Sequence, residues 1–344
     1  MARSFDLDKI AASFAQLASE SPKIFQNMGI PSPVATRMER AIVYTSNTRR
    51  FARALTLLNF GRELAGRELT QQEVADLHSL SWLVEVYSGS AIISDDLMDN
   101  STNRRGRPCW HLLPETGQRA TNDASLLRSA VFILLNHLFG HLPCYGGLLD
   151  SFLTNSFFLD AGQDYDAWLS NENFSTSWTH EQCERLGIIK SGWVLTLPAL
   201  LALHYFGLGA EINVTQTTEI LDPLGRLYQV RNDYDDIFGH LEEVGRVGTD
   251  IQENKCSWAI VEALRICNEE QRQELQQNVG KGDKDSAAKA QEFIRSLPIT
   301  ARFQEEERSC VAQLRGKVEE IDDSQGLKKS ALYSVISCYL REFL

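Results

Sequence analysis

The sequence predicts an all-α protein, a single helical bundle around a central apolar pocket that spans residues 1–344. Strand patterns are nearly absent, whereas long segments carry apolar residues at helical spacing with good helix formers between them. No linker is long enough to separate two domains, and no short repeat is present. Apolar residues make up 43% of the chain, which is enough for a sizeable core.

The predicted helices alternate with breaks in which Gly, Pro, Asn and Asp gather. The breaks fall at 106–117, 141–147, 239–248 and 280–285. The most apolar stretch, 192–209, is short for a membrane span and favours a buried helix that lines a cavity. The helical segments are 35–65, 71–99, 124–161, 181–208, 215–239, 255–267, 269–278 and 285–342.

Charge and cysteine usage narrow the class of protein. A net charge of −12 argues against non-specific binding to nucleic acid or to anionic lipid. The seven cysteines are scattered and form no C-x-x-C pair, as in proteins that keep reduced thiols. Acidic residues appear early in the N-terminus and no apolar signal core is present, so we expect a cytoplasmic protein without a leader.

Two acid-rich clusters stand near the C-terminal ends of apolar helical segments, at 95–99 and 232–236. Carboxylates at positions i, i+1 and i+4 lie on one side of a helix and repel each other in water. Such oxygen ligands suit Mg²⁺, which commonly joins carboxylates to substrate phosphates. Nearby basic residues would hold the remaining phosphate oxygens. The pattern predicts a diphosphate clamp with the cations Arg104, Arg105, Arg246 and Lys255.

Three motifs carry a resemblance to a known family. Residues 95–110 read DDLMDNSTNRRGRPCW, residues 162–166 read GQDYD, and residues 248–258 read GTDIQENKCSW. At these residues the chain resembles the trans-isoprenyl diphosphate synthase family, most closely the farnesyl diphosphate synthases of animals. A lone DDxxD would be weak evidence, but the joint motifs at the correct separation are specific.

The resemblance implies an all-α fold, three Mg²⁺ ions, an allylic prenyl diphosphate substrate and a homodimer. The chemistry it implies is ionisation, in which metals and cations stabilise the departing diphosphate while an apolar pocket shelters the carbocation. The metal ligands it implies are Asp95, Asp96, Asp99, Asp166, Asn232 and Asp236. The diphosphate-binding residues are Arg104, Arg105, Lys190, Arg246 and Lys255, and the catalytic set is Asp95, Asp96, Asp99 and Lys190.

Several departures from the family pattern fall on the subsite for isopentenyl diphosphate. The segment at 48–53 lacks both glycines of the family's GGKxxR, and Ser88 stands where the family has Gln. Glu342 lies in a C-terminal tail that is basic in the family, although Arg53 and Arg105 remain. These changes predict a weakened second substrate site.

A further departure concerns the depth of the pocket. Ser90 and Ala91 stand where farnesyl diphosphate synthases have two aromatic side chains, so the sequence predicts a deeper pocket. Neighbouring side chains could refill that space. The side chains expected around it are Phe157, Phe158, Trp193 and Tyr228.

Three functions fit these residues. The favoured one is a class I terpene synthase that ionises farnesyl or geranylgeranyl diphosphate to a sesquiterpene or diterpene. The first alternative is a trans-prenyltransferase that condenses isopentenyl diphosphate with an allylic diphosphate. The second is a non-catalytic partner subunit of a synthase, against which the intact Asp95, Asp96 and Asp99 argue.

Overall fold

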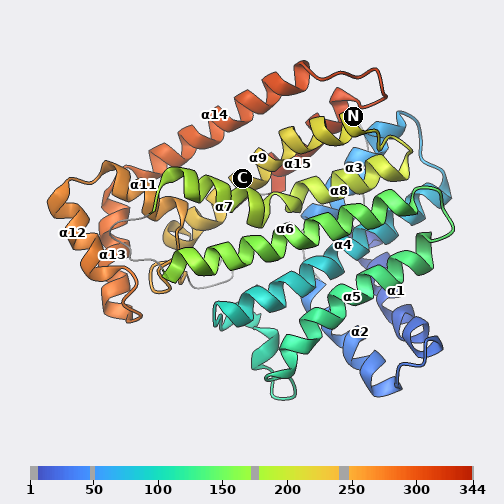
Figure 1. Ribbon diagram of the computed structural model, residues 1–344, viewed down its shortest axis with the longest axis horizontal. Coiled ribbons are helices and arrows are strands. Elements are labelled where there is room, and N and C mark those ends of the chain that lie inside the picture. The colour runs from blue at the N-terminus through green and yellow to red at the C-terminus, as the bar shows by residue number, and fades with distance from the viewer. Residues whose placement is uncertain (1–6, 47–50, 172–177, 240–247, 343–344) are drawn as a thin grey trace.

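A computed structural model of the chain describes residues 7–46, 51–171, 178–239 and 248–342. Its described part is almost entirely helical, as predicted (Figure 1). The long helices α4 (Gln71–Met98), α6 (Tyr145–Asn171), α8 (Trp193–Tyr205) and α9 (Glu211–Phe238) run through the middle of the bundle. The exception is a two-residue antiparallel hairpin, β1 (Asn103–Arg104) with β2 (Arg107–Pro108).

The other helices surround this centre. At one end lie α11 (Trp258–Ile266), α12 (Glu269–Asn278) and α13 (Lys284–Ser296), well away from α1 and α2 (Figure 1). The remaining elements are α1 (Leu7–Asn27), α2 (Ser32–Ser46), α3 (Ala52–Ala65), η1 (Trp110–Leu112), α5 (Arg119–Phe139), α7 (His180–Ser191), α14 (Ile299–Glu319) and α15 (Lys329–Glu342).

Helix boundaries follow local chemistry. Capping boxes begin α4 at Thr70, α7 at Thr179 and α12 at Asn268, in each case by satisfying backbone amides that would otherwise lack partners. The segment predicted at 285–342 is divided into α13, α14 and α15. Pro298 precedes α14, and Gly326, with a φ of 88°, lies before α15.

The structure also adds a helix that the prediction missed and divides another. Helix α1 buries Ile10, Phe14, Ala18, Ser21 and Phe25, at spacings of three and four residues that a search for helical periodicity could have found. The segment predicted at 35–65 contains α2 and α3, and residues 47–50 between them lie outside the described part.

Helices α7 and α8 meet at a bend of 43° beside Gly192. Glycines allow the neighbouring helices to approach this bend closely. A Cβ at Gly162 of α6 would lie 2.7 Å from Lys190 Cα, and a Cβ at Gly225 of α9 would lie 2.6 Å from Gly192 Cα. Larger residues would push α6 and α9 away, so these glycines hold the helices around Lys190 together.

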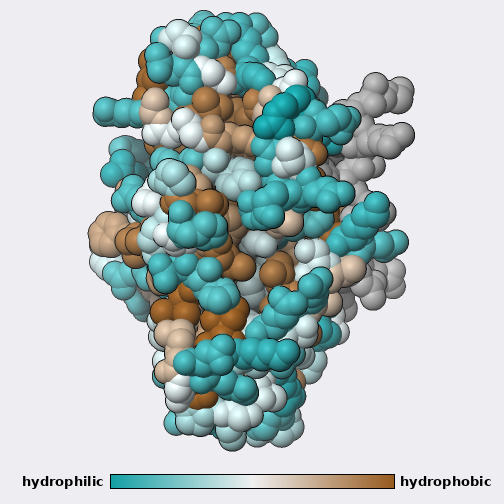
Figure 2. Space-filling model, turned by 90° about the vertical axis from the view of Figure 1, so that its right-hand side faces the viewer, coloured by the Kyte–Doolittle hydropathy of each residue, from teal (hydrophilic) through white to brown (hydrophobic). Residues whose placement is uncertain are grey.

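The core is continuous and rich in leucine. Helix α8 is buried from Trp193 to Leu203, and α4 is buried from Leu80 through Ser90. On the face shown in Figure 2, hydrophobic residues occur in small patches between hydrophilic ones. No single described helix is long and apolar enough to cross a bilayer, whereas the bent pair α7–α8 reaches that threshold by length and composition alone.

Candidate active site

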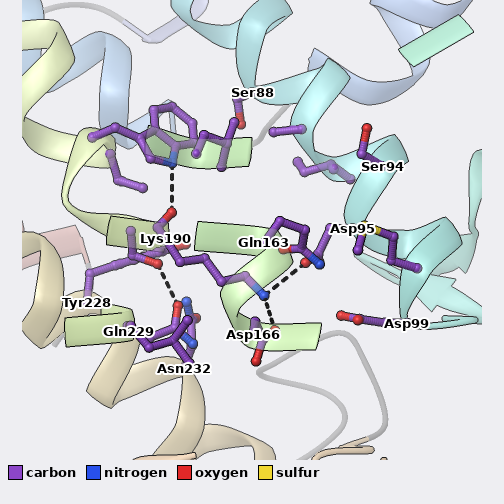
Figure 3. Close-up of a pocket in the computed structure, with 18 of the residues that line it drawn as sticks. Ser88, Ser94, Asp95, Asp99, Gln163, Asp166, Lys190, Tyr228, Gln229 and Asn232 are labelled. Carbon is purple, nitrogen blue, oxygen red and sulfur yellow. Dashed lines mark hydrogen bonds and ion pairs between the residues drawn. The ribbon is translucent and has the colours of Figure 1, made fainter. Parts of the chain in front are cut away.

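A cavity of about 590 Å³ opens between α4, α6, α7, α8 and α9. This size lies within the range of small-molecule sites in proteins. Asp95, Asp99, Asp166 and Lys190 lie near the C-terminal end of α4, and other charged, polar and apolar side chains complete the wall (Figure 3). The charged residues of the wall are Arg53, Asp95, Asp99, Arg104, Arg105, Arg128, Asp160, Asp164, Asp166, Lys190, Asp233, Asp250 and Lys255.

The first acid cluster lies at the end of α4 and is held by the hairpin that follows. Arg104 donates from Nη2 to Asp95 Oδ2 at 2.8 Å and to Asp96 Oδ1 at 2.6 Å. Burial alone would lower the pKa of Arg104, but Asp95 and Asp96 raise it above its ordinary value. The hairpin turns through Arg105 and Gly106, both with positive φ, which places the two arginines on the cavity wall.

The members of this cluster differ in where they point. Asp95 and Asp99 line the cavity, and burial together with the Asp95 charge raises the pKa of Asp99. Asp96 is buried, receives two hydrogen bonds from Arg104 and is absent from the wall. Arg104 thus binds Asp96 in this structure, and the role of Asp96 as a metal ligand stays a prediction.

Asp166 of α6 joins the two lysines of the site. Lys190 Nζ lies 2.7 Å from Asp166 Oδ2 and 3.2 Å from Asp95 Oδ1 (Figure 3). Lys255 Nζ lies 3.0 Å from Asp166 Oδ2 and 2.7 Å from Asp99 Oδ1. Burial would raise the pKa of Asp166, but the two lysines outweigh it and hold the pKa below its ordinary value. Three carboxylates from α4 and α6 thus share two ammonium groups.

The second acid cluster lies near the C-terminal end of α9. Asn232 lines the cavity, but Asp236 is not on its wall and accepts hydrogen bonds from the amides of Thr249 and Asp250 at 3.2 and 3.1 Å. In this structure those amides bind the Asp236 carboxylate, and its role as a metal ligand stays a prediction. Arg246 lies outside the described residues.

Asp233, which the sequence analysis did not assign, does line the cavity. It accepts hydrogen bonds from Gln229 Nε2 and from the Trp258 amide, both at 2.7 Å. Burial raises its pKa to about 7. Its place directly after Asn232 in an acidic run was the available signal. The cavity also contains Asp250 and the amide of Gln163, which the prediction likewise did not single out.

A second basic group lies on the same cavity wall. Arg53 of α3 donates to the fully buried Glu85 at 2.7 Å, and Arg105 donates to the Thr45 carbonyl at 2.9 Å. Burial and the charge of Arg53 lower the pKa of Arg105 to about 10. Because both arginines face the same carboxylate of the described residues, that of Glu85, this part of the cavity favours an added anion.

The apolar wall differs from the prediction at three positions. Ala91, Trp193 and Tyr228 line the cavity as expected. Ser90 is buried but does not reach the cavity, since its hydroxyl donates to the Tyr87 carbonyl at 2.7 Å. Phe157 and Phe158 are 71% and 49% exposed on the outer face of α6. Neither is a wall residue, because both point away from the bundle.

The oxygen donors suit Mg²⁺, although no described group of three His, Cys, Asp or Glu side chains is arranged around a single ion. Asp95, Asp99 and Asp166 instead converge on the ammonium groups of Lys190 and Lys255. They therefore already face a common positive charge, as ligands of a hard divalent cation do. The arrangement can bind a polyanion at its charged end and an apolar tail in its interior.

Comparison with known proteins agrees with this arrangement. The model of the polyprenyl synthetase family matches residues 36–297. The farnesyl pyrophosphate synthase of Candida albicans is 34% identical over 337 residues, which cover 94% of this chain and 96% of that protein. The bifunctional chrysanthemol synthase of Tanacetum cinerariifolium is 36% identical over 273 residues, 78% of this chain and 69% of its own.

A solved structure extends the likeness to the fold. The farnesyl diphosphate synthase of T. brucei complexed with risedronate superposes with a TM-score of 0.86 at 22% identity, over 98% of both chains. The family match covers most of the sequence, including the first acid cluster, the GQDYD segment and the second cluster. The chain therefore belongs to the polyprenyl synthetase family, the trans-isoprenyl diphosphate synthases that its motifs resemble.

Proposed function

We propose that the protein is a trans-prenyltransferase that condenses isopentenyl diphosphate with an allylic diphosphate. The observation that carries the proposal is the presence of two basic groups in one cavity, Lys190 with Lys255 and Arg53 with Arg105. A transferase needs two diphosphate sites, whereas a single-substrate synthase needs one. The relatives named farnesyl pyrophosphate synthases favour the same choice over the terpene synthase that the sequence departures suggested.

The charged end of the cavity fits the allylic diphosphate. Asp95, Asp99, Asp166 and Asn232 would hold Mg²⁺, which supplies charge stabilisation for the departing diphosphate when it is bound. The binding of three Mg²⁺ ions stays a prediction. Lys190 and Lys255 add positive charge within a partly dehydrated site, where electrostatic stabilisation is strong.

The reaction follows from this placement. The allylic carbon–oxygen bond breaks, and its electron pair leaves with the diphosphate. The double bond of isopentenyl diphosphate then attacks the allylic carbon, and one proton is lost. The apolar wall, which includes Leu159, Leu186 and Val194, keeps water from the cation.

A second candidate is an enzyme that uses allylic substrate alone. Ser88 lines the cavity, and its short side chain reaches less far than the Gln of the family pattern. The relative named chrysanthemol synthase shows that the family extends beyond proteins named for farnesyl pyrophosphate synthesis. Ionisation of farnesyl or geranylgeranyl diphosphate without condensation would make the protein a terpene synthase.

The two candidates differ in whether isopentenyl diphosphate binds. We expect calorimetry to detect one isopentenyl diphosphate per chain when it is titrated into protein saturated with Mg²⁺ and a non-reactive allylic thiolodiphosphate. Replacing Arg105 by Gln should weaken this binding by about 10-fold or more, because a charged hydrogen-bond donor is lost. An absence of binding in the parent protein would favour the single-substrate enzyme.

We also propose a homodimer in which the outer face of α6 is covered. Leu153, Phe157 and Phe158 are exposed there, and the rings of Phe157 and Phe158 meet edge to face at 5.9 Å between centroids. Clustered exposed aromatic residues are typical of protein interfaces. The same helix carries Asp166 inward, so dimer contacts on α6 would support the active site.

A further inference from the structure

Among the described residues, the aromatic side chains that line the cavity are Trp193 and Tyr228, and Tyr228 lies near Arg53 and Arg105. Ser90, one of the two positions expected to set the floor, does not reach the cavity, and the other, Ala91, contributes only a methyl group. Another side chain must therefore limit how far an allylic tail extends into the cavity. Trp193 is the larger aromatic group, and it is 7% exposed.

Contacts between α4 and the α7–α8 pair define the depth of this space. At the charged end, Lys190 meets Asp95 at 3.2 Å. Deeper, the Trp193 ring meets the Tyr87 ring edge to face at 5.1 Å between centroids. Tyr87 and Asp95 are two helical turns apart on α4, about 12 Å at 1.5 Å per residue. Ala91 lies midway between them on α4, and both Ala91 and Trp193 line the cavity.

Trp193 is held on several sides. Its Nε1 donates to the Lys190 carbonyl at 3.0 Å, and the Tyr87 ring behind it meets Phe152 at 5.8 Å between centroids. Tyr87 and Phe152 are fully buried. Figure 3 shows Lys190 reaching toward Asp95 and Asp166 while its carbonyl accepts this hydrogen bond. One turn of chain thus joins the Lys190 amine, which pairs with Asp95, to the Trp193 indole.

We propose that Trp193 sets the maximum length of the isoprenoid tail. Because Ala91, one turn of α4 from Asp95, has a small side chain, the space for the tail ends two turns from Asp95 instead of one. The inference rests on the proposed function for the identity of the ligand. It assigns to the bend between α7 and α8 a role in substrate and product length. Removal of the indole should admit a longer tail, and a ring at position 91 should exclude tails that the parent accepts.

The test measures binding with non-reactive allylic thiolodiphosphates of ten, fifteen and twenty carbons in the presence of Mg²⁺. For Trp193→Ala we expect the affinity for the twenty-carbon analogue, relative to the ten-carbon one, to rise by about 10-fold or more over the parent, because more apolar carbon is buried. Ala91→Phe should lower the same ratio. Trp168→Ala, which removes an exposed tryptophan outside the cavity, is the matched control and should leave it unchanged.

A melting curve for each variant separates misfolding from loss of binding. Trp193→Phe is a milder change, and it should shift the ratio of twenty-carbon to ten-carbon affinity in the same direction as Trp193→Ala. An unchanged ratio in folded Trp193→Ala or Trp193→Phe would overturn the inference. Because the analogues do not react, the ratio does not depend on condensation. A shifted ratio without condensation would overturn the transferase alone, and condensation with an unchanged ratio would overturn the role of Trp193 alone.

Discussion

At the scale of single residues, the site is a balance between carboxylates and cations. Lys190 lies between Asp95 of α4 and Asp166 of α6, and these carboxylates raise its pKa although burial opposes them. The ammonium group is therefore charged over the whole physiological range. When a substrate brings Mg²⁺ to Asp95 and Asp166, the metal would replace the Lys190 ammonium group as their partner. Lys190 would then bind the diphosphate.

Replacing Lys190 by Gln tests this role. We expect kcat/KM for the allylic substrate to fall by about 10- to 100-fold, since one charged hydrogen bond to the diphosphate is lost. The affinity for isopentenyl diphosphate should change much less. Lys329→Gln removes an outlying lysine that pairs with Glu319 and serves as the control in steady-state kinetics. A Lys190→Gln variant as active as the parent would contradict the role of Lys190 in binding the allylic diphosphate.

The sequence was informative about which residue types gather at the site and less so about which way each points. Asp95, Asp99, Asp166, Asn232, Lys190 and Lys255 all reach the cavity. The spacing i, i+1, i+4 could not show that Arg104 binds Asp96, or that the amides of Thr249 and Asp250 bind Asp236. Both outcomes depend on segments that follow the helix, and helical periodicity does not describe them.

At the scale of elements, α6 has two faces with different roles. Its inner face carries Gln163 and Asp166 to the cavity, and its outer face exposes Leu153, Phe157 and Phe158. An apolar outer face on a helix next to the site fits a second copy of the chain as its cover.

The proposed dimer predicts that Phe157→Glu shifts the protein from dimer to monomer in sedimentation velocity, because a charge would be buried in an apolar contact. Ile188→Glu places the same charge at a 39% exposed position on α7 and should leave the mass unchanged. A parent protein that sediments as a monomer at all concentrations would contradict the dimer.

Helix positions were predictable where periodicity was long and capped. The segment predicted at 71–99 is α4, Gln71–Met98, and that predicted at 215–239 is nearly α9, Glu211–Phe238. The bend at Gly192 was not predicted, because close packing of α9 against α8 at Gly225 is a tertiary effect. The division of 285–342 could have been read from Pro298 and Gly326.

At the scale of the whole molecule, the net charge is −12, and the described cavity wall carries both aspartates and cations. Local cations, and Mg²⁺ when bound, must therefore attract the diphosphates. The all-α class and the family were predictable from pattern and motif. The sequence favoured the terpene synthase, whereas the contacts among Arg53, Glu85 and Arg105 that support the proposed prenyltransferase form only in the folded chain. The single domain over residues 1–344 and the cytoplasmic location stay predictions.

The most direct test is product analysis after incubation with Mg²⁺ and an allylic diphosphate, with and without isopentenyl diphosphate labelled with carbon-14. If the cavity holds both diphosphates, the label should enter a longer allylic diphosphate, and a chelator should abolish the reaction. Diphosphate release with a hydrocarbon or alcohol product and no incorporated label would contradict the transferase and support a terpene synthase. No diphosphate release from any allylic substrate would contradict both and leave the non-catalytic partner subunit.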